Sequence, residues 1–289
     1  IKCPNINFAK LPKLFESMSK SLEDEEKHFK TLEVSSFVES KDFVNELKER
    51  SFADITFEQI SVLGDVNVEN IHVNAFGETS KRIQSFVCES CFLKNIQSLY
   101  PINRLPKLKS LAIGFNNTDI PTNAITTQVH ILLISGTTFT IRYGAFQYLN
   151  NLTTIGIPFA FVKKFQRESF RFIKPSNQTL TISFMSTFVK ADSFENGTFN
   201  YLQRPVNIMF EFDSATDYIP ENVFKSVLDN KQNKITFFRN SRISCENCGN
   251  QWLIRDNKQQ QIENPVCIEN VYKQLFDSEV IEKLKLKCG

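Results

Sequence analysis

The stretch LPKLKSLAIGFNNTDIPTNAI, residues 105–125, combines a short apolar alternation with a second apolar segment. Leu111 and Ile113 stand two positions apart, as the inward side chains of a half-buried strand do. Ile120 then begins a six-residue pattern, in which three free positions, the small residue Ala124 and the apolar residue Ile125 follow. The stretch therefore predicts a unit made of a strand, a turn and a second apolar segment.

The six-residue pattern recurs through most of the chain, and its last residue is usually Phe. Full copies end at Phe52, Phe76, Phe146, Phe170, Phe194 and Phe224, and a weaker copy ends at Pro101. These ends mostly lie roughly 21 to 25 residues apart, which is a spacing typical of repeat proteins. The recurrence accounts for the 28 Phe residues, against 6 Tyr and 1 Trp.

An alternating apolar pair precedes most copies of the pattern and predicts one short strand per unit. The pairs expected to point inward are Leu32/Val34, Ile60/Val62, Phe86/Cys88, Leu111/Ile113, Ile131/Leu133, Ile155/Ile157, Leu180/Ile182, Ile208/Phe210 and Ile235/Phe237. One such unit cannot bury its apolar face alone, whereas stacked units share a continuous core. A parallel β-helix or an ordinary α/β domain is the alternative, but neither has a reason to keep a small residue and Phe at one fixed phase.

The units resemble the leucine-rich repeat, whose pattern is L-x-x-L-x-L-x-x-N/C-x-L. In residues 105–125, Leu108, Leu111, Ile113 and Asn116 match that pattern. The chain is similar to this family over roughly residues 30–240, with Phe in place of Leu at the back of the unit and looser spacing in several units. The resemblance implies an α/β solenoid of about eight or nine repeats with a curved parallel β-sheet, whose concave face binds ligands.

Two Cys-x-x-Cys pairs, CESC at 88–91 and CENC at 245–248, raise the question of a zinc site. In a solenoid, six strands about 4.8 Å apart would separate the pairs by on the order of 29 Å, so one metal ion could not bind both. A redox dithiol would need a thioredoxin-like setting, which the repeats do not offer. The remaining interpretation is a set of disulfide anchors.

The last four cysteines follow the last predicted strand, and CGNQWL places Trp252 four residues after Cys248. This arrangement resembles the C-terminal flanking cap of extracellular leucine-rich repeat proteins, although two residues rather than one separate the first two cysteines. The resemblance implies the disulfides Cys245–Cys267 and Cys248–Cys288, with Trp252 packed against the last repeat. A ligand-stacking role for Trp252 is the alternative.

Three cysteines remain. Cys88 and Cys91 are either two buried structural thiols or a disulfide. An odd total leaves at least one free thiol or one intermolecular bond. Cys3 is the residue expected in either role, so a Cys3-linked dimer or hetero-complex is a candidate assembly.

Residues 8–30 carry Leu11, Leu14, Phe15, Met18 and Leu22 at helical spacing. They predict an amphipathic helix that covers the first repeat, or alternatively a partner-binding helix. The chain is therefore expected to comprise an N-terminal cap at 1–30, a repeat array at 31–240 and a C-terminal cysteine-rich cap at 241–289.

Four sequons and seven cysteines favour a secreted, extracellular glycoprotein. The acceptor residues are Asn116, Asn151, Asn177 and Asn196. The 34 Lys and Arg residues are interspersed with 32 Asp and Glu residues, so no basic field for nucleic acid is expected. No apolar run is long enough to predict a membrane span. The layout is similar to that of secreted arthropod leucine-rich repeat proteins and favours an arthropod source.

The outward strand positions are expected to form the concave binding face, and those between the apolar pairs carry no charge. The candidate contact residues on and beside that face are His130, Leu132, Thr154, Met209, Glu211 and Phe238. A surface that is largely uncharged and partly apolar suits a protein or glycan ligand better than a phosphate.

The sequence gives little support for catalysis. Its three histidines are far apart in the repeat order, and none belongs to a motif with a nucleophile and an orienting carboxylate. A Gly-rich phosphate loop is absent from the sequence, and no cofactor or metal is expected. We therefore expect a secreted, non-enzymatic binding module that recognises a protein or glycan. The alternative is a non-catalytic or structural subunit of a larger extracellular assembly.

Overall fold

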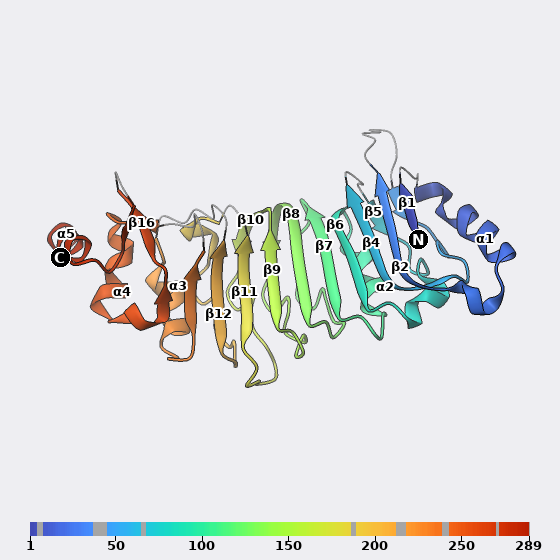
Figure 1. Ribbon diagram of the computed structural model, residues 1–289. Helices are drawn as coiled ribbons and strands as arrows, with labels where there is room; N and C mark the ends of the chain where they lie inside the picture. The colour runs from blue at the N-terminus through green and yellow to red at the C-terminus, as the bar shows by residue number, and fades with distance from the viewer. Residues whose placement is uncertain are drawn as a thin grey trace. The chain divides into compact units, whose positions relative to one another are not determined.

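The computed structural model describes residues 1–4, 8–36, 45–64, 68–185, 189–211, 218–238, 243–269 and 272–288. The chain has an α/β fold with a large parallel β-sheet of twelve strands and few, short helices (Figure 1), a layout consistent with a solenoid. It divides into an N-terminal unit, Ile1–Asp119 with Ala124–Thr137, and a C-terminal unit, Ile120–Asn123 with Thr138–Gly289. This division falls inside the predicted 31–240 array, and the predicted boundaries at 30 and 240 stay predictions.

The N-terminal unit carries parallel strands in the order β1-β2-β4-β6-β7-β8 and a separate β3-β5 pair. Its elements are β1 (Lys2–Pro4), η1 (Phe8–Lys10), α1 (Leu11–Ser21), η2 (Asp24–Lys27), β2 (His28–Ser36), β3 (Asn45–Leu47), β4 (Thr56–Gly64), β5 (Val68–Ile71), η3 (Gly77–Lys81), β6 (Ser85–Leu93), η4 (Ile96–Leu99), α2 (Tyr100–Asn103), β7 (Ser110–Asn116) and the first part of β8 (Ile131–Ile141).

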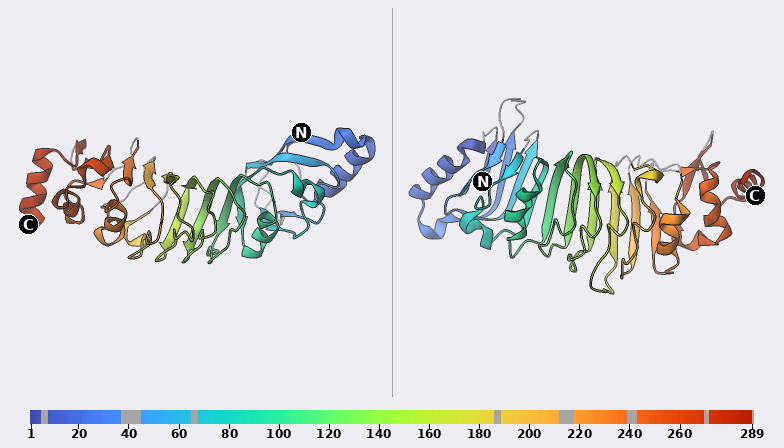
Figure 2. Two further views of the ribbon diagram at one scale, coloured as in Figure 1. Left: turned by 90° about the horizontal axis from the view of Figure 1, so that it is seen from below. Right: turned by 180° about the vertical axis from the view of Figure 1, so that it is seen from behind.

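The C-terminal unit carries parallel strands in the order β9-β11-β12-β13-β15, which lie side by side in Figure 2, and a small β14-β16-β17 sheet. Its elements are β9 (Thr154–Pro158), β10 (Ala160–Phe165), β11 (Leu180–Met185), η5 (Ala191–Ser193), β12 (Val206–Glu211), α3 (Glu221–Leu228), β13 (Lys234–Phe237), β14 (Ile243–Ser244), η6 (Cys248–Asn250), α4 (Gln251–Arg255), η7 (Lys258–Gln261), β15 (Ile262–Glu263), β16 (Val266–Ile268), β17 (Tyr272–Gln274) and α5 (Ser278–Cys288).

The predicted strand pairs are buried in the core, with one exception in β8. There the inward residues are Leu132 and Ile134, which register with Leu111 and Ile113 of β7. The prediction that placed Ile131 and Leu133 inward, and Leu132 on the exposed face, was therefore wrong by one residue. The run ILLI at 131–134 has no polar residue to mark the outward side, and a shift of one residue exchanges the two faces of a strand.

Two stacks of Phe rings fill the core of the C-terminal unit. In one, Phe210 lies between Phe184 and Phe237, with ring centroids 5.3 and 5.4 Å away. The second stack lies behind the strands, where Phe199 packs 5.1 Å from Phe170 and 5.2 Å from Phe224. Aromatic pairs at these distances stabilise beyond the area that they bury.

Phe199 corrects the predicted position of one copy of the six-residue pattern. The prediction placed that copy at 189–194, but Phe194 forms a bridge with Phe165 and stacks on it at 4.8 Å. The residue equivalent to Phe170 is Phe199, because the window FENGTF at 194–199 also has Phe first, a small residue fifth and Phe last. The pattern fits both windows, and the core contacts decide between them.

The N-terminal segment contains the predicted amphipathic helix in a shorter form, as α1. Leu11 and Phe15 are its buried residues, and the Phe15 ring lies 5.7 Å from Phe52 and 5.6 Å from Phe57. The helix ends at Ser21, and the acidic run that follows forms the 3-10 turn η2. Its apolar side therefore packs on the aromatic core of the N-terminal unit.

Candidate functional site

The strands of the C-terminal unit have a second face, which we call the outer face, and its residues alternate with the apolar core residues on β9, β11, β12, β13 and β15. Gly156, Pro158, Ser183 and Thr236 of this face are buried, and its other residues are half-buried or exposed. The parallel register aligns them in cross-strand rows: Thr154, Thr181, Asn207 and Lys234; Gly156, Ser183, Met209, Thr236 and Glu263; and Pro158, Met185 and Glu211, with Phe238 just after β13.

Polar side chains on the outer face bond to one another across the strands. Lys234 Nζ lies 2.5 Å from Glu263 Oε1, and Thr236 Oγ1 lies 3.0 Å from Glu263 Oε2 and 3.1 Å from Asn207 Oδ1. The hydrogen bond from Lys234 is the main cause that lowers the pKa of the Glu263 carboxyl. Because these groups bond within the face, they present a surface of low net charge.

Apolar side chains occupy the middle and the carboxyl end of this face. Met209 is half-buried in the central row, and Phe238 follows β13 with 40% of its surface exposed. Phe159, directly after β9, is 73% exposed and has a positive φ of 48°, with its N–H bonded to the Met185 carbonyl at 2.9 Å. A bulky residue in this backbone conformation is strained, and such strain often accompanies function.

Four of the six predicted contact residues share the outer face: Thr154, Met209, Glu211 and Phe238. Glu211 accepts a hydrogen bond of 2.9 Å from Ser183 Oγ. Leu132 is in the core, as described above. His130 is an exposed residue of the N-terminal unit directly before β8, and its backbone N–H donates to the Lys109 carbonyl at 2.7 Å.

Three disulfides are present, and they include the two pairings implied by the resemblance. Cys245–Cys267 and Cys248–Cys288 have Cα separations of 4.9 and 5.5 Å. Cys88 and Cys91 are also bridged, which resolves that alternative. Together the first two bridges fasten α5 and β16 to the segment around η6.

Cys3 is the free cysteine. Its side chain is buried in β1, and burial raises the pKa of its thiol. This position favours an unreactive internal thiol over the Cys3-linked assembly considered from the sequence.

The C-terminal segment is attached to α3 by buried and charged contacts. Trp252 is only 3% exposed, and its Nε1–H donates to the Ile219 carbonyl at 2.7 Å. Arg255 bonds to Glu221 at 2.6 Å, and Lys225 pairs with Asp256 at 2.8 Å. A tryptophan in this setting is a packing residue, because a bound ligand would have no access to its ring.

The predicted sequons differ in accessibility. Asn151, Asn177 and Asn196 are exposed. Asn116 is half-buried at the end of β7, where its Oδ1 accepts a hydrogen bond of 2.8 Å from Thr137 Oγ1. We therefore expect the Asn116 amide to be the least available of the four in the folded chain.

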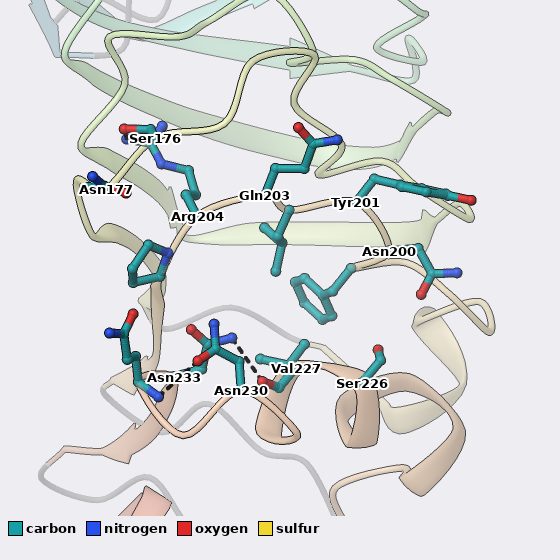
Figure 3. A pocket seen from close by; sticks show the side chains of 14 residues that line it. Ser176, Asn177, Asn200, Tyr201, Gln203, Arg204, Ser226, Val227, Asn230 and Asn233 are labelled. Carbon is teal, nitrogen blue, oxygen red and sulfur yellow. Dashed lines mark hydrogen bonds between the residues drawn. The ribbon is translucent and has the colours of Figure 1, made fainter.

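A pocket of about 540 Å³ lies at the amino ends of β11, β12 and β13, away from the carboxyl ends that carry Glu211 and Phe238. Figure 3 shows it between the loop 199–205 and the end of α3. Its wall is mostly amide and hydroxyl side chains, with the single cation Arg204. Sequence reasoning missed this pocket, because loops that carry no recognisable motif build it.

Among the described residues, no cluster of His, Cys, Asp and Glu could hold a metal ion. Within those same ranges, no helix has the length and apolar character needed to cross a bilayer. A search of protein-family models finds no match to this chain, and a search of curated proteins finds none either.

Proposed function

We propose that this chain is an extracellular, non-enzymatic leucine-rich repeat module that binds a protein or glycan through the outer face of its C-terminal unit. Parallel strands with a recurring Phe behind them support the repeat assignment. Three disulfides and exposed sequons support an oxidising, secretory environment.

The two bridged segments suit the role of a cap. A stack of repeats exposes the apolar side of its last unit, which must be covered to keep the protein soluble. In this proposal, Trp252 and the segment held by Cys245–Cys267 and Cys248–Cys288 cover that end, and α1 covers the other.

The binding role rests on one observation, namely the composition of the outer face. Met209 and Phe238 supply apolar contact area, while the bonds of Lys234 and Thr236 to Glu263 hold its polar groups in fixed positions. A pre-organised surface with apolar residues among polar ones loses little side-chain entropy when a partner binds.

The experiment compares tagged secreted proteins returned to the extracellular fluid of the source organism. Wild type is expected to co-purify with a partner of fixed stoichiometry, and Met209→Lys with Phe238→Ser is expected to lose it. Tyr148→Ser, a change at an exposed aromatic outside the outer face, serves as the matched control. Retention of the partner by the double variant, with normal folding, would exclude the outer face as the binding surface.

A further inference from the structure

We propose that the pocket between the loop 199–205 and the end of α3 binds a saccharide that carries a carboxylate, with Arg204 as its counter-ion. This site is separate from the outer face and does not depend on its function. The pocket volume of about 540 Å³ falls in the range of small-molecule sites.

Arg204 is the observation that points to an anion. Arg204 is a buried residue with 5% of its surface exposed, its Nε donates to the Gln178 carbonyl at 3.1 Å and its Nη2 donates to Ser176 Oγ at 3.3 Å. Its guanidinium also lies 5.3 Å from the Phe172 ring. Within the described residues these partners are all neutral, and burial lowers the pKa of Arg204.

A buried cation normally has a carboxylate partner, because removing a charge from water is costly unless another charge compensates it. Nη1 of Arg204 has no hydrogen-bond partner in the described part of the chain. A guanidinium offers paired donors that match the two oxygens of a carboxylate. A single cation suits one carboxylate, whereas a phosphate-rich ligand would be expected to meet several.

The rest of the pocket has the chemistry that sugar hydroxyls need. Amide side chains donate and accept hydrogen bonds, as hydroxyl groups do. Asn177 and Gln203 are exposed at the pocket, and Asn230 uses its Oδ1 to accept the Gln232 N–H at 3.0 Å. The lining contains no Asp, Glu or Lys.

An aromatic ring lies at one side of the pocket, where it can contact the apolar C–H face of a sugar. Tyr201 remains 55% exposed although the Arg171 guanidinium lies 5.3 Å from its ring. Arg171 is itself held by a hydrogen bond of 2.6 Å to Tyr143 Oη. In Figure 3, Tyr201 lies at the other end of the loop from Arg204, and its ring extends away from Arg204 and Ser176. The ring is thus exposed and pre-positioned.

The backbone of the loop 199–205 is held in an unusual conformation. Tyr201 and Gln203 have φ values of 59° and 51°, which are unusual for residues other than Gly. The preceding loop holds both, because Phe172 N–H bonds to the Tyr201 carbonyl at 3.2 Å and Ser176 N–H bonds to the Gln203 carbonyl at 3.1 Å. The strained backbone conformation, held by these hydrogen bonds, fixes the directions of both side chains, and such strain is often found at binding sites.

The test measures binding of methyl β-glucuronide and methyl β-galacturonide against their neutral methyl glycosides, by calorimetry and saturation-transfer NMR. All proteins carry Thr179→Ala, which removes the sequon and keeps the Asn177 amide in the pocket. At least one acidic glycoside is expected to bind about tenfold more tightly than its neutral counterpart, the effect of one charge-assisted contact.

Arg204→Gln should abolish that preference, and Tyr201→Ala should weaken the acidic and neutral glycosides alike. Arg167→Gln and Tyr148→Ala are the matched controls, because both residues lie outside the pocket lining, and both should bind as the parent protein does. If Arg204→Gln fails to fold, Gln203→Ala, an exposed change, must still weaken binding. Absence of binding by both acidic glycosides, or an acidic preference that survives Arg204→Gln, overturns the proposal.

Discussion

The disulfide Cys248–Cys288 should contribute most of its stabilisation by restricting the unfolded chain. Cys248 is exposed and Cys288 half-buried, so replacing both with Ser removes the crosslink with little loss of core packing. The bridge closes a loop with a sequence separation of 40 residues. Loop-closure entropy then gives a loss of about 3.9 kcal/mol at 25 °C.

The same arithmetic ranks the three bridges by their loops. Cys245–Cys267, with a separation of 22 residues, should contribute about 3.4 kcal/mol, and Cys88–Cys91, with a separation of 3, about 1.6 kcal/mol. The Cys88–Cys91 bridge therefore constrains the unfolded chain least.

Denaturant unfolding followed by Trp252 fluorescence can measure the loss. Trp252 is the only tryptophan and is buried beside this bridge, in the segment that begins at η6. Each single Cys→Ser variant, with its remaining thiol alkylated, should lose as much stability as the double variant, because either change removes the whole crosslink. Single losses that add up to the double loss, or a double loss below about 1 kcal/mol, would refute the entropic account.

Three further outcomes are expected. Phe199→Ala should cost about 3–5 kcal/mol in chemical denaturation, because it interrupts a buried ring stack, and a surface-like loss under about 1 kcal/mol would contradict that stack. Hydrogen bonds from Arg255 and Lys225 lower the pKa of Asp256 from 3.8 to about 2, so its contribution is present above pH 3.8 and disappears as the pH falls toward 2; Asp256→Asn should flatten the stability curve in that interval. Iodoacetamide should label Cys3 only after unfolding. A Cys3 adduct formed on the native protein, or a dimer band on a non-reducing gel that disappears with reductant, would contradict the burial of this thiol.

Most strand phases could be predicted because each strand pair must point into one shared core. Thr154 precedes Ile155, and Asn207 and Glu211 stand on either side of Ile208 and Phe210, so polar residues mark the outward positions and the alternation is readable. In β8 every neighbour of Leu132 is also apolar up to Ser135, and the alternation loses its marker. Only the register with β7 fixes which face is buried.

The pattern behind the strands was ambiguous for a related reason. Val189 to Phe194 and Phe194 to Phe199 both satisfy the six-residue pattern, and local composition cannot choose between them. The choice depends on the neighbouring turns, because Phe199 completes a stack with Phe170 and Phe224. A six-residue pattern describes one segment of the chain and contains no information about the neighbouring segments that its Phe residue contacts.

The pocket shows a different limit of sequence reasoning. Left-handed backbone usually signals itself through Gly, but at Tyr201 and Gln203 it is adopted by residues with no such preference. The conformation is stabilised from outside the loop, by hydrogen bonds from the 172–176 segment and by the guanidinium of Arg171. Because each of these partners lies outside the loop 199–205, the shape of the loop depends on its contacts with a segment that is distant in the sequence. A deletion in the 172–176 segment should therefore disturb the pocket while leaving the cross-strand bonds of Lys234 and Thr236 with Glu263 in place, since those bonds use none of its residues.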